Sequence, residues 1–361
     1  MKDIPGNLPI NAYYAITCKK ISQISTSCNS CLFGEDDCRK AIRSHSVSVA
    51  ALRSIANDGH VYTFTSPTHD ELARIYNAGK YRPKSLSINE ASTYYGFCSN
   101  HDDSIFSEIE KTDITPTGKQ IFLFHFRAYS RVFYLNKTAG QALREIYNAK
   151  LPDGHNPIDA LATVASHFQP QGEAFSDLNK NFESMRLCLS SKNIPILEHI
   201  FIRINCTPEV MCSTIFVPIY DINGDFLLDI EEKSELDSCQ AMSITISKDL
   251  YGGFILLVWN CEDKITSTFI KTFIKSGYDL NRLIAVIFGN TENIFFNKNW
   301  WNKLDDELTS LLMYFSSVQF MNSADPARDH LQLMHKIIAY NQKKYLNWSI
   351  LSASSPDGTQ A

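Results

Sequence analysis

Three cysteines and a Cys-x2-His pair in the first hundred residues could together bind a metal ion. Cys28, Cys31 and Cys38 lie in one short segment, and Cys98 and His101 follow within "GFCSNHDD". Thiolate sulfur and imidazole nitrogen are typical ligands of structural zinc, which takes four of them in a tetrahedron. A cysteine on a turn and a histidine in the first turn of the next helix would face one point. The spacing therefore predicts a zinc site.

The first pair of ligands is open on spacing alone. Cys28 and Cys31 have Cys-x2-Cys spacing, whereas Cys31 and Cys38 bracket the loop "LFGEDD", in which Gly34 suits a tight exposed turn. The alternative to a metal is a set of reduced cysteines that pack as small apolar side chains. That alternative is the expectation for the cysteines of the second half of the chain.

A short helix and a strand must lie between the two ligand pairs. Residues 48–59 predict a helix, with Ser48 as its N-cap and Gly59 as a left-handed stop. The β-formers of "HVYTF" predict a strand, and "HDDSIFSEIEK" predicts a helix that begins beside the second pair. Residues 119–150 predict one long helix or two consecutive ones. A two-ligand loop, a hairpin and a two-ligand helix form the plan of a treble-clef module.

The segment that carries these ligands resembles a widespread group of bacterial Cys/His zinc-finger-like proteins. The resemblance rests on "CLFGEDDCRKAIRSHSVSVAALRSIANDGHVY" and "INEASTYYGFCSNHDDSIFSEIE", and covers roughly residues 28–132. That group carries, in this order, a Cys pair, AI-x-SHS, a GHVY-like strand and a GFC-x2-HD block. The resemblance implies Cys31 and Cys38 as the first pair, with Cys98 and His101 as the second. The loop after Cys31 is longer than in the group, which keeps Cys28 open.

The group is in turn similar to zinc-stabilised HNH endonucleases. These enzymes place a His after the first Cys pair and an Asn or similar residue just after the second, and His45 and Asp102 take those places here. The similarity implies that His45 is the general base that activates water and that Asp102 holds a catalytic Mg²⁺ or Mn²⁺. Arg127 and Arg131 lie one helical turn apart and would contact phosphate of a nucleic acid. A role in a bacterial antiviral defence or stress system follows from the same resemblance.

The sequence departs from the HNH pattern in two places. His45 is followed by Ser-Val-Ser-Val, where HNH motifs have a hydrophobic-Pro run. The third motif residue has no clear equivalent on the final helix, so that Asp103 or Glu108 would have to substitute for it.

Each candidate also has a simpler structural role. His45 would cap the next helix or lie beside the metal, and Asp102 would place a favourable negative charge at a helix N-terminus. Arg127 and Arg131 would form ion pairs. The partners of these arginines would be Glu108 or Glu110.

Composition and apolar runs predict a cytoplasmic protein that does not enter a membrane. Hydrophobic residues make up 44% of the chain and charged residues 20%, as in globular proteins. Runs such as "GGFILLVW" are far too short to span a bilayer, and the first residues lack the apolar core of a signal peptide. In the cytoplasm the ten cysteines stay reduced.

Charge is divided unevenly along the chain. Residues 1–150 contain 18 Lys and Arg against 14 Asp and Glu, and the remaining residues contain 16 against 25. A mildly basic front half fits a contact with nucleic acid, and an acidic back half fits a protein partner. The same distribution fits an ordinary pair of domains.

The back half changes in character after "LPDGHNP" (residues 151–157), which we take as a domain boundary. Strand-like runs follow, among them "HIFIRINC", "STIFVPIY", "GDFLLDI", "AMSITIS" and "GGFILLVW". Asn223-Gly224 predicts a hairpin turn. Residues 283–288 predict another strand, and helices are expected at 267–276, 303–316 and 329–343.

The sequence thus predicts an α+β protein in two parts. Residues 1–150 would form a zinc-binding, HNH-like module with a long helix. Residues 151–361 would form a mixed or antiparallel sheet with helices, and end in a disordered tail, "SASSPDGTQA". Two functions are compatible with this plan: a metal-dependent nuclease, or a non-catalytic interaction or sensor protein. In the second, zinc is a structural clasp and the back half binds a protein or small ligand.

Overall fold

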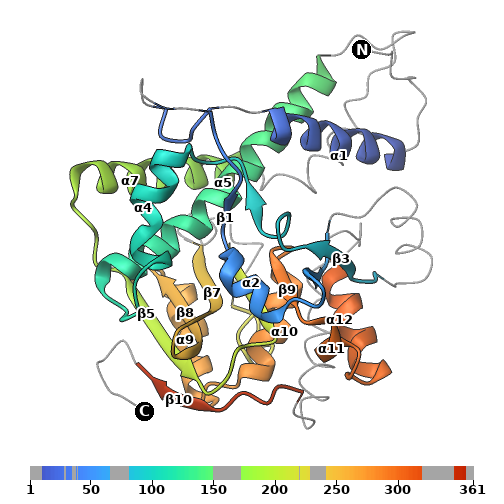
Figure 1. Cartoon of the computed structure of the whole chain (residues 1–361), viewed down its shortest axis with the longest axis vertical. Coiled ribbons are helices and arrows are strands. Elements are labelled where there is room, and N and C mark those ends of the chain that lie inside the picture. Colours follow the sequence, from blue (N-terminus) through green and yellow to red (C-terminus); the bar gives the residue numbers. More distant parts are fainter. Residues whose placement is uncertain are drawn as a thin grey trace.

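An antiparallel sheet of eight strands joins the two halves of the sequence (Figure 1). The strand order is β10-β5-β8-β7-β6-β9-β2-β3, so that two strands of the front half extend the sheet of the back half. The computed structural model describes residues 10–27, 30–34, 38, 40–65, 81–148, 172–218, 220–227, 241–318 and 345–354.

The strands are short and paired throughout in antiparallel register. The eight-stranded sheet consists of β2 (His60–Thr63), β3 (Lys84–Ser87), β5 (Glu198–Ile204), β6 (Val210–Phe216), β7 (Met242–Asp249), β8 (Gly252–Trp259), β9 (Ile294–Phe296) and β10 (Ile350–Ala353). A separate two-stranded sheet pairs β1 (Ser44–His45) with β4 (Thr93–Tyr94).

Helices cover both faces of the large sheet. Their bounds are α1 (Ile10–Ser27), α2 (Val49–Ile55), α4 (Ser99–Glu110), α5 (Gly118–Tyr147), α7 (Gly172–Ser191), α9 (Lys264–Lys275), α10 (Leu280–Asn290), α11 (Lys298–Trp301) and α12 (Asp306–Val318). In the part of the chain that is described, none of them combines the length and the apolar character that crossing a bilayer requires.

Alternate residues of the central strands bury opposite faces of the sheet. In β8, Ile255 and Leu257 pack in one core with Phe269 of α9, whereas Phe254 and Leu256 pack in a second core with α5 and α7. Successive side chains of a strand point to opposite faces, so these continuous apolar runs fit a strand that is covered on both sides. The result is a three-layer arrangement with the sheet in the middle.

Helix α5 is the main element of one layer. Thr117 caps it by accepting a hydrogen bond from the backbone N–H of Gln120, at 3.2 Å. Nineteen of its residues are buried, because α1, α4, α7 and the strands β6 to β8 surround it. Figure 1 shows α4 and α7 beside it, above the strands β5, β7 and β8. It therefore ties the candidate ligand region to the sheet.

Several sequence-based expectations are confirmed. The fold is α+β, Ser48 caps α2 through its side chain, and "HVYTF" contains β2. Helix α4 begins at Ser99, and residues 119–150 contain one long helix rather than two. Asn223-Gly224 lies in a turn that is closed by a bridge between Tyr220 and Phe226.

Other expectations are wrong. Residues 283–288 belong to helix α10, whose N-cap is Asp279, and not to a strand. Helix α2 ends at Ile55, so that Gly59 lies in the turn before β2, with φ of 74°, instead of ending the helix. Ser352 and Ala353 of the expected disordered tail form part of β10.

Some expectations fall outside the described residues. These are the domain boundary at 151–157, the helix at 329–343 and the tail from residue 355 onward.

A buried histidine makes the stability of this layer depend on pH. His125 of α5 lies within 2.8 Å of the hydroxyl of Ser243 in β7, and burial lowers its pKa to about 4. An unfolded His125 takes up a proton below about pH 6.5, but the folded one stays neutral until about pH 4. Unfolding therefore binds a proton in this range, and the free energy of unfolding falls as the pH drops.

We predict that His125→Gln removes this contribution. Between pH 7 and pH 4 the free energy of unfolding of the variant should fall by roughly 3 kcal/mol less than that of the wild type. Urea denaturation at several pH values measures the difference, with the exposed His60→Gln as the control. If the free energy of unfolding depends on pH in the same way for wild type and His125→Gln, the lowered pKa of His125 is contradicted.

Candidate metal centre and adjoining polar site

Three thiols and one imidazole converge at the start of α4. The Sγ atoms of Cys31, Cys38 and Cys98 lie 3.4, 3.4 and 3.3 Å from Nδ1 of His101. All four ligand atoms lie within 4.8 Å of one another. Cys31 and Cys98 are buried, and Cys38 and His101 are partly exposed. This cluster can hold a metal ion.

Backbone hydrogen bonds hold the two ligand segments side by side. The N–H of Leu32 donates to the carbonyl of Gly96, and the N–H of Ile42 donates to that of Phe97, both at 2.7 Å. Ala41 also forms an antiparallel bridge with Cys98. These contacts bring together two segments that are far apart in the sequence.

Cys98 is both a helix cap and a ligand candidate. It is the N-cap residue of α4, with an extended backbone, and its carbonyl accepts the first helical hydrogen bond from Asp102 at 2.9 Å. Its side chain makes no capping hydrogen bond, and its sulfur faces His101 instead. The helix start therefore sets the position of both Cys98 and His101, as the Cys-x2-His spacing predicts.

A phenylalanine orients the imidazole. Phe33 stacks on His101, with ring centroids 4.6 Å apart and planes inclined by 15°. The turn that carries Phe33 is closed by a 3.0 Å hydrogen bond from the N–H of Gly34 to the carbonyl of Cys31, and Gly34 has φ of 65°. That left-handed backbone is one that glycine adopts readily. The turn thus fixes the aromatic ring against the ligand histidine.

Burial disfavours thiolates in this cluster when no cation is present. Burial, together with the neighbouring Cys38 and Cys98 side chains, raises the pKa of Cys31 to about 12, although backbone hydrogen bonds from Cys98 and Phe33 oppose this rise. A metal ion reverses this balance, because metal-bound cysteine is deprotonated. Metal binding at this site therefore releases protons.

The structure brings together the four ligands that the resemblance implies. Cys28, the alternative ligand, lies outside the described residues. Cys212 is buried in the main core, and Cys261 is exposed on a turn. Within the described ranges no other group of three or more His, Cys, Asp or Glu residues is placed to hold a metal ion.

His45 and Asp102 share two charged neighbours, Arg127 and Glu110. His45 belongs to β1, opposite Thr93 of β4, and Asp102 lies in the first turn of α4. Both residues are partly exposed, but Nε2 of His45 and Oδ1 of Asp102 are buried and have no hydrogen-bond partner. Strand β1 therefore carries His45, and helix α4 carries Asp102.

These two side chains belong to a set of buried polar atoms on β1, β4, α4 and α5 that interact with one another, and we call this set the polar cluster. Each atom is buried and makes no hydrogen bond of good geometry, although the Ser44 hydroxyl lies close enough to Asp102 to lower the pKa of its carboxyl. The atoms are Ser44 Oγ, His45 Nε2, Tyr94 OH, Asp102 Oδ1, Arg127 Nε and Arg131 Nε. Leaving such an atom unpaired costs about 1–3 kcal/mol, so this concentration calls for an explanation.

The charges of the polar cluster influence one another. Burial lowers the pKa of His45, and the positive charge of Arg127 lowers it further. Burial raises the pKa of Asp102, whereas the neighbouring Ser44 hydroxyl and Arg127 oppose this rise. His45 is therefore neutral at pH 7 and able to accept a proton.

The two predicted phosphate-binding arginines have different surroundings. Arg127 is only 3% exposed, pairs with Oε1 of Glu110 through Nη2 at 2.6 Å, and lies 4.1 Å from the ring centroid of Phe106. Ion pairing with Glu110 is one of the structural roles that the sequence predicts for Arg127. Burial lowers the pKa of Arg131 to about 10, although Glu292 and Tyr94 oppose this effect.

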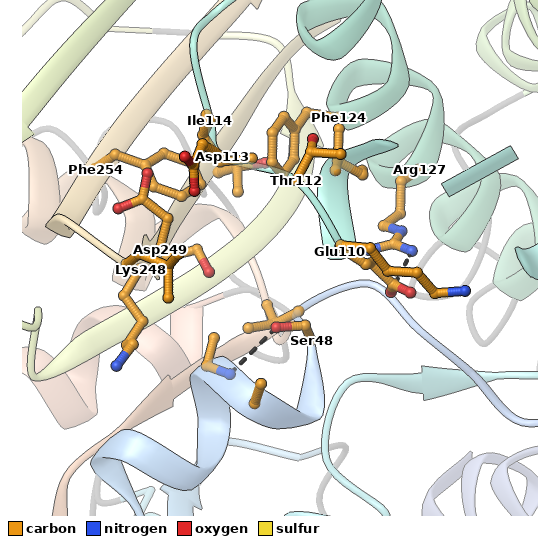
Figure 2. A pocket seen from close by; sticks show the side chains of 18 of the residues that line it. Ser48, Glu110, Thr112, Asp113, Ile114, Phe124, Arg127, Lys248, Asp249 and Phe254 are labelled. Atoms are coloured by element: carbon orange, nitrogen blue, oxygen red, sulfur yellow. Dashed lines mark hydrogen bonds and ion pairs between the residues drawn. The ribbon is translucent and has the colours of Figure 1, made fainter. Parts of the chain in front are cut away.

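Arg127 also lines a cavity of about 450 Å³ (Figure 2). Its walls include Ser48 beside α2, Glu110 at the end of α4, and Lys248 and Asp249 at the end of β7. Sequence reasoning missed this cavity, since β7 is distant in the chain. The position of Glu110 could be found from the sequence, because it lies about two helical turns after Asp102 on α4.

Comparison with protein-family models, with curated proteins and with solved structures finds no match for this chain. Its function must therefore be argued from the geometry of the site.

We predict that Cys98→Ser abolishes metal binding. Loss of one thiolate from a four-ligand site should lower the metal content from about one ion per chain to near zero. Elemental analysis of the purified protein measures this, with the exposed Cys261→Ser as the control that keeps the metal. Equal metal content in both variants, or none in the wild type, would refute the site.

Proposed function

We propose that the Cys31, Cys38, Cys98 and His101 cluster binds zinc as a structural clasp. Three sulfurs and one nitrogen form a donor set that suits zinc. Tetrahedral zinc has bonds of about 2.3 Å to sulfur and 2.0–2.1 Å to nitrogen, so that each sulfur atom lies about 3.5 Å from the nitrogen atom. The separations of 3.3 and 3.4 Å from Nδ1 of His101 agree with this value. All four positions are filled by side chains, which is typical of a structural rather than a catalytic zinc site.

We further propose that the protein acts on nucleic acid as an HNH-like hydrolase with His45 and Asp102 at its centre. The observation that carries this proposal is the polar cluster, in which both residues present a buried polar atom without a partner. In a working active site, bound water and a metal ion would supply those partners. Strand β1 follows the segment of Cys31 and Cys38, and helix α4 carries both the ligand candidate His101 and Asp102.

In this proposal His45 is the general base. Its neutral imidazole takes a proton from water as the water oxygen attacks phosphorus, and the bond from phosphorus to the leaving oxygen breaks. Asp102 would hold a divalent Mg²⁺ or Mn²⁺ ion, which supplies positive charge to the phosphate oxygens. One carboxylate is sufficient for this purpose when substrate phosphate and water complete the coordination.

A second candidate function is a non-catalytic interaction or sensor protein. The observation in its favour is the Arg127–Glu110 ion pair. A hydrolase would use Arg127 to bind phosphate, but here Arg127 is paired with Glu110. The cavity beside that pair is suited to a small ligand. In this case the zinc clasp only shapes the fold, and the acidic back half binds a partner.

We predict that His45→Ala lowers hydrolysis of DNA or RNA by at least about 100-fold, because general bases contribute about 10² to 10⁴ to the rate. Cleavage of single- and double-stranded substrates with Mg²⁺ or Mn²⁺ is the measurement. The exposed His60→Ala is the matched control, and zinc content should stay unchanged in both variants.

An absence of cleavage by the zinc-loaded wild type would end the hydrolase proposal. Equal rates for His45→Ala and wild type would do the same. Either result would leave the zinc clasp and the second candidate standing.

A further inference from the structure

A second cavity is lined by residues of α1, α5, β2, β3, β4 and β9, and we call it the Arg131 cavity. Its volume of about 390 Å³ falls within the roughly 300–1,000 Å³ typical of small-molecule sites. Helix α1 forms one wall and packs on α5, where the hydroxyl of Tyr134 donates a 2.9 Å hydrogen bond to the carbonyl of Ser25. Elements of both halves of the chain therefore enclose the space.

Arg131 brings an unpaired positive charge to this cavity. Its Nε atom is buried and has no hydrogen-bond partner. Within the described part of the chain its guanidinium forms no ion pair with a carboxylate, in contrast to that of Arg127, which pairs with Glu110. Burial lowers the pKa of Arg131 only to about 10, so that the group stays protonated at pH 7. A cation that is withdrawn from water without a partner is costly, and an anionic ligand group offsets that cost.

Two carboxylates line the same cavity. Glu292 lies just before β9, and its negative charge is near enough to oppose the fall in the pKa of Arg131. Glu90 lies between β3 and β4 and is exposed. One positive and two negative groups disfavour a phosphate ester, which brings up to two further negative charges near pH 7. They favour a ligand that carries a carboxylate and an ammonium group side by side.

The remaining wall offers accessible apolar surface and a hydroxyl group. Ile21 of α1 and Leu86 of β3 line the cavity, and both are partly exposed rather than packed in the core. Thr65, which follows β2, is also partly exposed here. An aliphatic chain gains free energy by covering such apolar surface, and the threonine hydroxyl can donate to a carboxylate.

We propose that the Arg131 cavity binds a free α-amino acid. The guanidinium of Arg131 binds the α-carboxylate through two parallel hydrogen bonds, and Glu292 pairs with the α-ammonium group. The amino-acid side chain lies against Ile21 and Leu86. The inference goes beyond the zinc clasp and the hydrolase and rests on neither, because binding is measured without turnover.

Isothermal titration of the full-length protein with L-leucine, L-methionine, L-lysine and L-arginine tests the proposal. For each amino acid, the amine that lacks the carboxylate and the Nα-acetyl derivative are partial probes. We expect at least one amino acid to bind. Its two partial probes should bind at least about tenfold more weakly, because each lacks one of the two charges that the wall recognises.

Arg131→Met should weaken binding of that amino acid by at least about tenfold. Methionine keeps an apolar chain in place of the arginine stem, and removal of an unpaired charge should leave the melting temperature equal or higher. Arg144→Met is the matched control. Arg144 is exposed on the same helix and does not line the cavity, so its variant should bind as the wild type does.

Cys18 reports occupancy of the cavity in the unaltered protein, which keeps the test valid if Arg131→Met fails to fold. It lines the cavity from α1 and is partly exposed, whereas Cys261 is exposed and lies outside the cavity. A saturating amino acid should slow the alkylation of Cys18 by iodoacetamide several-fold and leave that of Cys261 unchanged. Peptide mass spectrometry measures both rates.

Four results would overturn the proposal. The first is the absence of binding by all four amino acids, and the second is equal affinity for an amino acid and its amine or Nα-acetyl derivative. The third is unchanged binding by Arg131→Met, or alkylation of Cys18 that no amino acid slows. The fourth is binding of inorganic phosphate in place of the amino acids, which would mark a simple anion site. None of these outcomes bears on the zinc clasp or on cleavage by His45.

Discussion

The convergence of Cys31, Cys38, Cys98 and His101 is the contact on which the front half depends. The described residues of the segment that carries Cys31 and Cys38 form no helix and no strand. Few backbone contacts therefore hold this segment in place other than its hydrogen bonds to Gly96 and Phe97. Cys98 and His101 lie at the start of α4, which packs on α5, and α5 covers the sheet. A metal in this cluster therefore links an irregular segment to the central helix, and through it to the main core.

Arg127 connects the two sites that lie next to this clasp. Its positive charge lowers the pKa of His45 and opposes the rise in the pKa of Asp102, and its guanidinium pairs with Glu110 at the cavity. A buried arginine needs several partners to offset its desolvation. Here Glu110 and the ring of Phe106 supply part of that stabilisation, and Nε is left without a partner. This Nε atom belongs to the polar cluster on which the hydrolase proposal rests.

The local elements of the site could be predicted from sequence, but their long-range partners could not. Cys98 and His101 lie three residues apart at a helix start, and Ser48 caps a short helix, so spacing and capping rules were sufficient there. The pairing of β2 with β9 joins residues from opposite ends of the described chain, and no local pattern encodes it. For the same reason β7 residues that line the cavity were missed. Residues 283–288 are apolar throughout, which predicts a strand, but burial of α10 between the core and α12 gives a helix the same composition.

In the proposed clasp one zinc ion is held by three cysteines and one histidine. X-ray absorption at the zinc edge of the purified full-length protein tests it most directly, since this method reports the type, number and distance of the atoms around the metal. We expect three sulfur atoms at about 2.3 Å and one nitrogen at about 2.0–2.1 Å from the zinc ion. A shell of oxygen and nitrogen alone, a shell of four sulfurs, or protein purified without zinc would contradict it.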